Sequence, residues 1–160
     1  MTSAPPDTES NLWPAVLLFS AVYLGVSALV TAILVGFDLD ANSGVATGVL
    51  VGSVAAGAHK FVGAYRRPFK RGEQLRFALL AFLALLVMTC IQIVGVAPFL
   101  VKAEEWQGFM TEAQAWIAEN TGLLVGIIVV VALIYFAILY FTSGWFSRWF
   151  AKRLNTSVRT

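Results

Sequence analysis

Four long runs of apolar residues, separated by short polar or charged stretches, set the pattern of this chain. They cover about residues 13–37, 44–62, 77–101 and 122–141. Each is close to or longer than the ~20 residues that an α-helix needs to cross a ~30 Å hydrocarbon core. Because backbone groups in lipid must be hydrogen-bonded within their own segment, we expect the runs to be helices. The pattern predicts an all-α polytopic membrane protein, with a four-helix transmembrane domain over residues 13–143.

The segments outside the runs include two short amphipathic ones. Residues 102–120 carry an apolar stripe at helical spacing, and we expect a helix that either lies flat on the outer membrane surface or caps the bundle. Residues 144–160 combine aromatic and basic positions, which predicts a basic cytoplasmic tail lying in the membrane surface after a bend at Ser143–Gly144. A straight continuation of the fourth span is the alternative. The first run is too long for a signal peptide, so we expect it to be retained as a membrane span. Residues 1–12 before it are expected to be a disordered cytoplasmic tail.

Composition supports lipid as the solvent of this chain. Of its 160 residues, 59% are hydrophobic and 12% are charged, whereas about a quarter of the residues of a soluble domain are charged. A globule of this size cannot hide so much apolar surface. Cys90 is the only cysteine, which excludes an internal disulfide. The net charge of +2 gives no reason to expect a nucleic-acid partner.

The basic residues predict the orientation. Ten of the eleven Lys and Arg residues fall on one side of the predicted membrane, and Lys102 is the exception. By the positive-inside rule, the N and C termini are cytoplasmic. The same charges imply anionic lipid headgroups as partners of the chain. The residues expected at these headgroups are Arg66, Arg67, Lys70, Arg71, Arg148, Lys152 and Arg153.

Small residues recur at every fourth position of the second run, at Gly44, Gly48, Gly52 and Ala56. Neither spacing of a phosphate-binding glycine loop is present, and no strand is expected before the stripe. Between helices in lipid, small residues permit close backbone contact, which replaces the hydrophobic effect as the cause of association. We interpret the stripe as a helix-packing seam of the glycine-zipper kind. Packing within the chain is favoured, and packing against a second copy is the alternative.

Polar residues inside the runs are few. Gln92 is expected to point into the bundle near Gly52–Ser53, where Ser53 or a backbone carbonyl would bind it, and Ser27 lies on a face of small and polar residues in the first run. His59 and Lys60 lie beside the basic cluster, and we expect them at the headgroups rather than in a ligand site. His59 is the only histidine, so a histidine-based metal site or catalytic triad cannot be assembled. No catalytic residue, metal or cofactor is therefore expected.

The connection between the second and third runs resembles a family of uncharacterised small bacterial inner-membrane proteins known by a locus-tag name. The likeness rests on the small residues 55–58, Phe61, Arg66, Pro68 and Glu73. It covers about the first hundred residues. It implies a four-helix protein of the bacterial cytoplasmic membrane and no activity.

Together these features favour a non-enzymatic accessory, structural or interaction protein of that membrane. It would bind a membrane-protein partner or form a homo-oligomer. A small oligomeric transporter or channel is the alternative, although transporters of this size usually carry a carboxylate within the membrane, and the runs contain none.

Overall fold

The computed structural model describes residues 10–37, 43–100 and 103–157, and they form four helices. These are α1 (Trp13–Gly36), α2 (Ser43–Tyr65), α3 (Arg71–Leu100) and α4 (Ala103–Ser157). Each contains a segment long and apolar enough to cross a membrane. The all-α polytopic fold is confirmed, and each predicted span lies on its own helix. Residues 38–42, between α1 and α2, lie outside the described residues.

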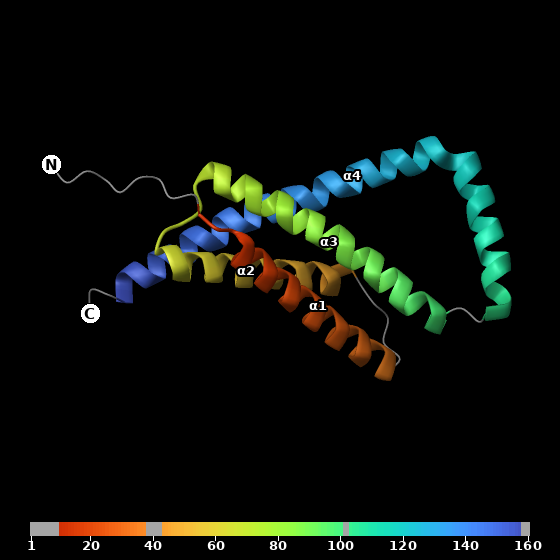
Figure 1. Cartoon of the computed structure of the whole chain (residues 1–160), viewed down its shortest axis with the longest axis horizontal. Helices are drawn as coiled ribbons and strands as arrows, with labels where there is room; N and C mark the ends of the chain where they lie inside the picture. The colour runs from red at the N-terminus through yellow and green to blue at the C-terminus, as the bar shows by residue number, and fades with distance from the viewer. Residues whose placement is uncertain (1–9, 38–42, 101–102, 158–160) are drawn as a thin grey trace.

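Going round the bundle, neighbouring helices follow in the order α1, α2, α4, α3. α2 packs against α1 and α4, while α3 packs against α1 and α4 on the other side. All four helices lie close together at one end and diverge toward the other (Figure 1). We call the first of these the basic end, because it holds the last turn of α2, the first turn of α3 and the last turns of α4, where Lys and Arg residues gather. The opposite end is called the distal end.

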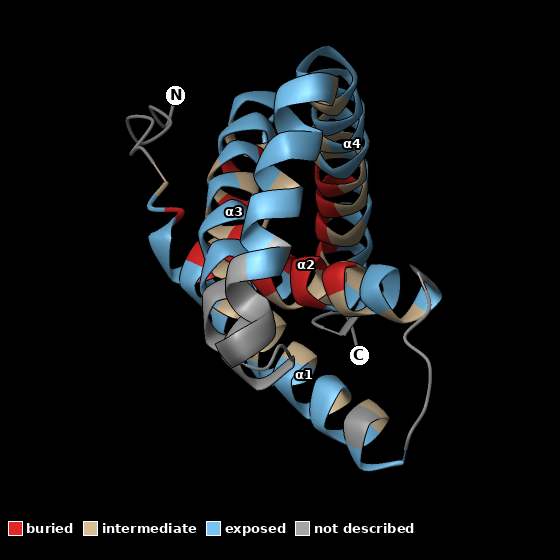
Figure 2. Cartoon of the chain, turned by 90° about the vertical axis from the view of Figure 1, so that its right-hand side faces the viewer, coloured by how far each residue is buried: buried red, intermediate tan, exposed pale blue. Residues whose placement is uncertain are grey.

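The core of the bundle lies in its basic-end half. On α1 the buried side chains stop at Phe19, and on α3 they run from Phe77 to Leu85. On α4 they begin at Leu139, and in Figure 2 the buried segments of the helices face one another. The distal halves of α1, α3 and α4 instead expose large apolar side chains. Lipid is the solvent that such surfaces require.

An aromatic column runs through this core. The rings of Tyr65, Phe61, Phe69 and Phe77 follow one another with centroids 4.7, 4.1 and 5.2 Å apart. Phe19 continues the column from Phe77 at 6.4 Å. Aromatic pairs at such spacings add to the free energy gained by burying their area. The column joins α1, α2, α3 and the connection between α2 and α3.

α4 consists of two helical parts joined at Asn120, whose φ of −114° and ψ of 20° are not helical. The Asn120 side chain donates a hydrogen bond to the carbonyl of Trp116 at 2.9 Å, four residues back. Figure 1 shows the first part crossing the distal end and turning sharply into the long second part. The predicted division between residues 102–120 and the fourth span is confirmed. A flat position on the membrane surface stays a prediction.

The predicted bend at Ser143–Gly144 is wrong, because α4 continues through it to Ser157. Gly144 is buried, and a Cβ there would lie 2.5 Å from Nε2 of Gln74 on α3. That Nε2 donates a 2.7 Å hydrogen bond to the Tyr140 carbonyl. Glycine at this position therefore permits a close approach of α3, and it does not break the helix. Residues 144–157 are the end of a bundle helix rather than a separate tail, since Ser147 and Ala151 are buried.

The N-terminal tail is shorter than predicted. Ser10 donates a hydrogen bond to Glu73, and the Asn11 backbone N–H donates one to the Tyr65 hydroxyl at 2.8 Å. Leu12 is buried in the core. These three residues are therefore part of the bundle, while residues 1–9 lie outside the described part of the chain.

The glycine stripe does not pack within the chain as predicted. Gly44 is exposed, Ala56 is half-buried, and a Cβ placed on Gly48 or Gly52 would meet nothing within 4 Å. The close approach is instead at Gly57, where a Cβ would lie 2.9 Å from Cζ of Phe77 and 3.0 Å from the Ala15 carbonyl oxygen. The face that turns inward holds larger residues, since burying them gains more contact. They are Leu50, Val54, Phe61 and Val62.

Gly57→Ala is expected to destabilise the protein by about 1–3 kcal/mol, because the new methyl group meets a packed ring and a backbone oxygen. Gly52→Ala is the matched control on the same helix. It enters open space and replaces a poor helix former, so it should leave stability unchanged or raise it by up to about 1 kcal/mol. Unfolding in mild detergent measures both. Equal stability of the two variants would contradict the packing at Gly57.

Candidate functional site

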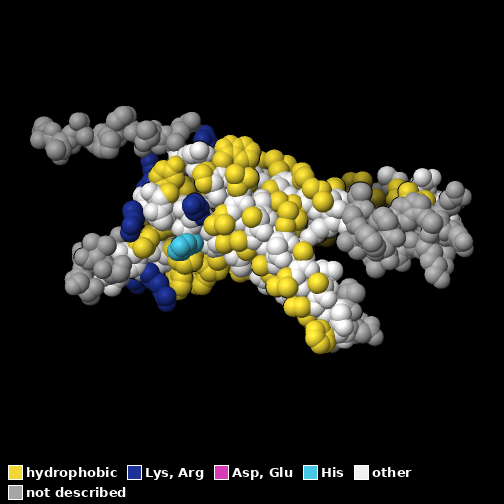
Figure 3. All heavy atoms as spheres, turned by 60° about the horizontal axis from the view of Figure 1, so that its bottom comes forward, with side chains coloured by type: hydrophobic (Ala, Val, Ile, Leu, Met, Phe, Trp, Pro, Cys, Tyr) yellow, Lys and Arg dark blue, Asp and Glu magenta, His cyan; other side chains and the backbone are white. Residues whose placement is uncertain are grey.

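The basic end carries the charged residues that the sequence assigned to lipid headgroups. Figure 3 shows Lys and Arg side chains at this end, separated from a largely apolar surface. Nearly all are exposed, which suits contact with phosphate groups. The described members are Arg66, Arg67, Lys70, Arg71, Arg148, Lys152 and Arg153, of which Arg67 is half-buried.

Arg67 has a structural partner in Glu73. Its Nη1 and Nη2 each donate to a carboxylate oxygen of Glu73 at 2.7 Å, which is the bidentate geometry of a strong ion pair. Glu73 also accepts a 2.8 Å hydrogen bond from the Lys70 backbone N–H. Lys70 directly precedes α3, and Glu73 is the third residue of α3. The hydrogen bond from the Lys70 N–H to the Glu73 carboxylate is therefore half of a capping box. The Arg67 guanidinium lies 5.6 Å from the Phe61 ring centroid, which ties the ion pair to the aromatic column.

The turn between α2 and α3 begins at Arg66, which has a positive φ of 53°. Its N–H donates to the Val62 carbonyl at 2.8 Å, so α2 ends in a left-handed residue. Pro68 disfavours helix at Arg67 and prevents α2 from continuing. Phe69 then enters the core between the rings of Phe61 and Phe77.

His59 and Lys60 are both exposed on α2 near the basic end. The His59 ring packs edge-on against Phe150 of α4, with centroids 5.0 Å apart. Among the described residues, no group of three His, Cys, Asp or Glu side chains could hold a metal ion. The His59 ring is thus part of the contact between α2 and α4 through Phe150.

Gln92 points into the bundle, but its partner is not the predicted one. Its Nε2 donates a hydrogen bond to Oγ of Ser27 on α1 at 2.5 Å. Ser53 is buried and donates instead to the Val49 carbonyl of its own helix at 2.7 Å. Gln92 thus joins α3 to α1, because these two helices are neighbours while α2 lies on the far side of α1.

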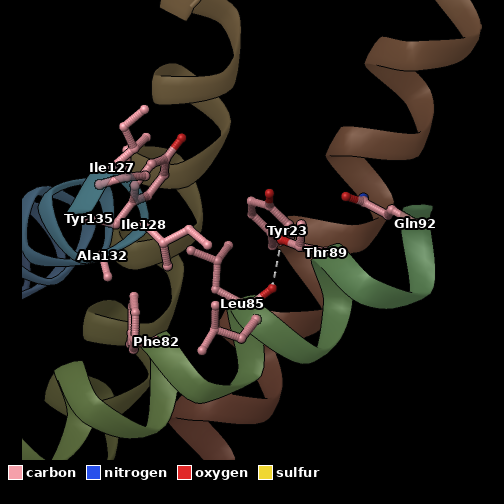
Figure 4. A pocket seen from close by; sticks show the side chains of 11 residues that line it. Tyr23, Phe82, Leu85, Thr89, Gln92, Ile127, Ile128, Ala132 and Tyr135 are labelled. Atoms are coloured by element: carbon pink, nitrogen blue, oxygen red, sulfur yellow. Dashed lines mark hydrogen bonds between the residues drawn. The ribbon is translucent and has the colours of Figure 1, made fainter. Parts of the chain in front are cut away.

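Two cavities meet at Gln92. The larger, which we call the three-helix cavity, has a volume of about 530 Å³ and is lined by α1, α3 and α4. A smaller one of about 210 Å³ lies between α1 and the distal half of α2. Tyr23 and Gln92 line both cavities. Figure 4 shows the Gln92 amide pointing toward Tyr23, with Phe82 and Leu85 below and Tyr135 on the opposite wall.

The sequence reading did not single out Tyr23 or Tyr135. Each lies in an apolar run with no spacing signal, and only the fold brings them to one cavity. The ion pair of Glu73 with Arg67 was not predicted either. The capping-box position of Glu73 was the available signal.

Comparison with known proteins gives no relative for this chain. No family model, curated protein or solved structure matches it. The resemblance at the connection between α2 and α3 therefore stays a prediction.

Glu73→Gln is expected to destabilise the protein by about 1–3 kcal/mol, because Arg67 and the first turn of α3 lose a charged acceptor. Glu112→Gln, at an exposed position of α4, should change stability by less than about 0.5 kcal/mol. Denaturant unfolding in detergent compares the two variants. The role of the ion pair is refuted if they are equally stable.

Gln92→Leu and Ser27→Ala form a double-mutant cycle for the bond between α3 and α1. We expect a coupling energy of about 0.6 kcal/mol, the average for hydrogen bonds between membrane helices. The double variant should therefore be less destabilised than the sum of the two single variants. Additive effects would mean that the two side chains do not interact.

Proposed function

We propose that this chain is a non-catalytic accessory protein of the bacterial cytoplasmic membrane that binds another membrane protein along the glycine face of α2. The observation that carries the proposal is the open space at Gly48 and Gly52. We define the glycine face by Gly44, Gly48 and Gly52, which are all exposed.

The energetics of a membrane helix favour a partner at this face. Each glycine lowers helix stability by about 1 kcal/mol relative to alanine. At Gly57 this loss is offset by close contact with Phe77, whereas a Cβ on Gly48 or Gly52 would meet no atom of the described residues within 4 Å. Small residues in lipid promote association because they let another backbone approach closely. A helix of a second protein would provide the contact that the chain itself does not.

The exposed apolar side chains of the distal half support the same proposal. Leu29 on α1 is 61% exposed and Ile91 on α3 is 59% exposed, so the distal half offers further apolar surface to a membrane partner. The buried core and the ion pair fix the basic-end half. A partner can therefore bind distally without disturbing the packed part of the bundle.

The orientation that we propose follows from the charges at the basic end. With those residues at anionic headgroups, both termini are cytoplasmic and the distal end faces outward. The first part of α4 would then cross the outer membrane surface, where the exposed Trp116 suits the interface.

A small oligomeric transporter or channel is the second candidate. It is supported by the polar pair of Ser27 and Gln92 beside two cavities within the spans. This candidate predicts solute flux into proteoliposomes that Gln92→Leu abolishes.

The proposed association is tested by replacing both open glycines. Gly48→Leu with Gly52→Leu should preserve the fold, because both side chains enter open space, and should block a close-packed partner. We expect wild-type protein, cross-linked in native membranes and purified in mild detergent, to run as a complex of fixed stoichiometry. The double variant should run as a folded monomer.

Leu83→Trp is the matched control, because it adds similar bulk to an exposed position of α3 away from the glycine face. It should retain the complex. A monomeric wild type, or a complex that survives the glycine replacements, would contradict the proposal. A complex made only of this chain would identify the partner as a second copy.

A further inference from the structure

The three-helix cavity has the dimensions and lining of a small-molecule site. Its volume of about 530 Å³ lies within the range of ligand pockets in proteins, about 300–1,000 Å³. Apolar side chains of α3 and α4 form most of its wall, including Phe82, Leu85 and Ala132. Leu86 on α3 and Ile127 and Ile128 on α4 line the cavity and are exposed, so the cavity borders the apolar outer surface of the bundle. A molecule dissolved in the membrane can therefore enter from the side.

A small set of polar groups converges on this apolar space. Tyr23 lines it from α1 and Tyr135 from α4, and Figure 4 shows the two rings on opposite walls. Thr89 donates its hydroxyl proton to the Leu85 carbonyl, so it is satisfied within α3. Gln92 uses Nε2 to bind Ser27, which leaves its Oε1 as an acceptor.

The two tyrosine hydroxyls carry the inference. Among the described residues, neither has a hydrogen-bond partner, although both side chains line the cavity. A hydroxyl left unpaired in a medium without water is costly. An occupant with acceptor oxygens would satisfy both donors.

Depth and charge narrow the class of occupant. Tyr23 lies about 15 Å along α1 from its first residue and Tyr135 about 22 Å along α4 from the kink, at 1.5 Å per residue. Both are thus well inside a ~30 Å hydrocarbon core, away from its edge, where the ester groups of phospholipids lie. Among the described residues that line the cavity there is no Asp, Glu, Lys, Arg or His, so they provide no counter-charge for an ionic ligand.

We propose that the three-helix cavity binds a neutral, lipid-soluble carbonyl compound of the ketone or quinone class. The phenols of Tyr23 and Tyr135 donate hydrogen bonds to its carbonyl oxygens. Phe82, Leu85 and Ala132 enclose its apolar body. This site shares no residue with the glycine face of α2, so it does not depend on the proposed function.

A photoreactive ketone tests the site. Wild-type protein in lipid nanodiscs is irradiated with 4-decylbenzophenone, and the labelled peptides are identified by mass spectrometry. We expect saturable labelling of the α3 and α4 segments that line the cavity. A decyl-substituted benzoquinone should compete with the probe, whereas decane should not.

Removing the two hydroxyls tests the hydrogen bonds. Tyr23→Phe with Tyr135→Phe keeps both rings and should weaken labelling about tenfold, since two hydrogen bonds of ordinary strength are lost. Labelling that is unsaturable and spread over all lipid-facing segments would overturn the proposal. So would wild-type labelling of the double variant, or equal competition by decane.

Filling the cavity gives an independent test. Ala132→Trp places an indole among the lining residues and should abolish saturable labelling. Leu133→Trp, one residue away and 63% exposed in wild type, is the control that should label normally. Circular dichroism and gel filtration confirm folding of each variant. If Ala132→Trp does not fold, the tyrosine variants decide the question.

Discussion

The approach of α2 to Phe77 at Gly57 is the contact on which the rest of the bundle depends. Lipid removes the hydrophobic effect as a cause of helix association, so helices are held by close contact and by polar bonds. Gly57 brings the α2 backbone against the Phe77 ring and the Ala15 carbonyl, which joins three helices at one level. The aromatic column continues from this point to the basic end, where the pair of Arg67 and Glu73 fixes the turn between α2 and α3. The helices pack closely at the basic end and diverge toward the distal end (Figure 1). The three-helix cavity lies between α1, α3 and α4.

Some glycines of this chain lie at close contacts between helices, whereas others lie on an open face. Gly57 and Gly144 lie where another helix comes within contact distance of the backbone. Gly48 and Gly52 have the same chemistry and a more regular spacing, but within the described part of the chain no atom would lie within 4 Å of a Cβ on either. Spacing alone therefore marks a face without saying whether that face turns inward. α2 turns Leu50, Val54 and Phe61 inward, because burying these side chains gains more van der Waals contact than burying the glycine face would.

The sequence was sufficient for the features that follow from one helix at a time. The number of spans depends on hydropathy and the break near Asn120 on local sequence, and both were predictable. The partner of Gln92 was not, because it depends on which helices are neighbours: the order α1, α2, α4, α3 brings Ser27 to Gln92 and keeps Ser53 away. The straight course of α4 through Gly144 was only the less favoured alternative, for the same reason. Sequence alone suggests that a glycine breaks a helix, whereas Gly144 leaves the room that Gln74 of α3 needs to reach the Tyr140 carbonyl.

The two proposed sites can be separated because they use different helices. The three-helix cavity is lined by α1, α3 and α4, and the glycine face belongs to α2 alone. Tyr23 and Gln92 are the residues through which the sites could influence each other, since they line both the larger cavity and the smaller one beside the distal half of α2. A ligand that reorients Tyr23 would alter the space between α1 and α2, and with it the face that α2 offers to a partner. The bond between Gln92 and Ser27 limits such movement, because it holds α3 to α1 at the boundary between the two cavities.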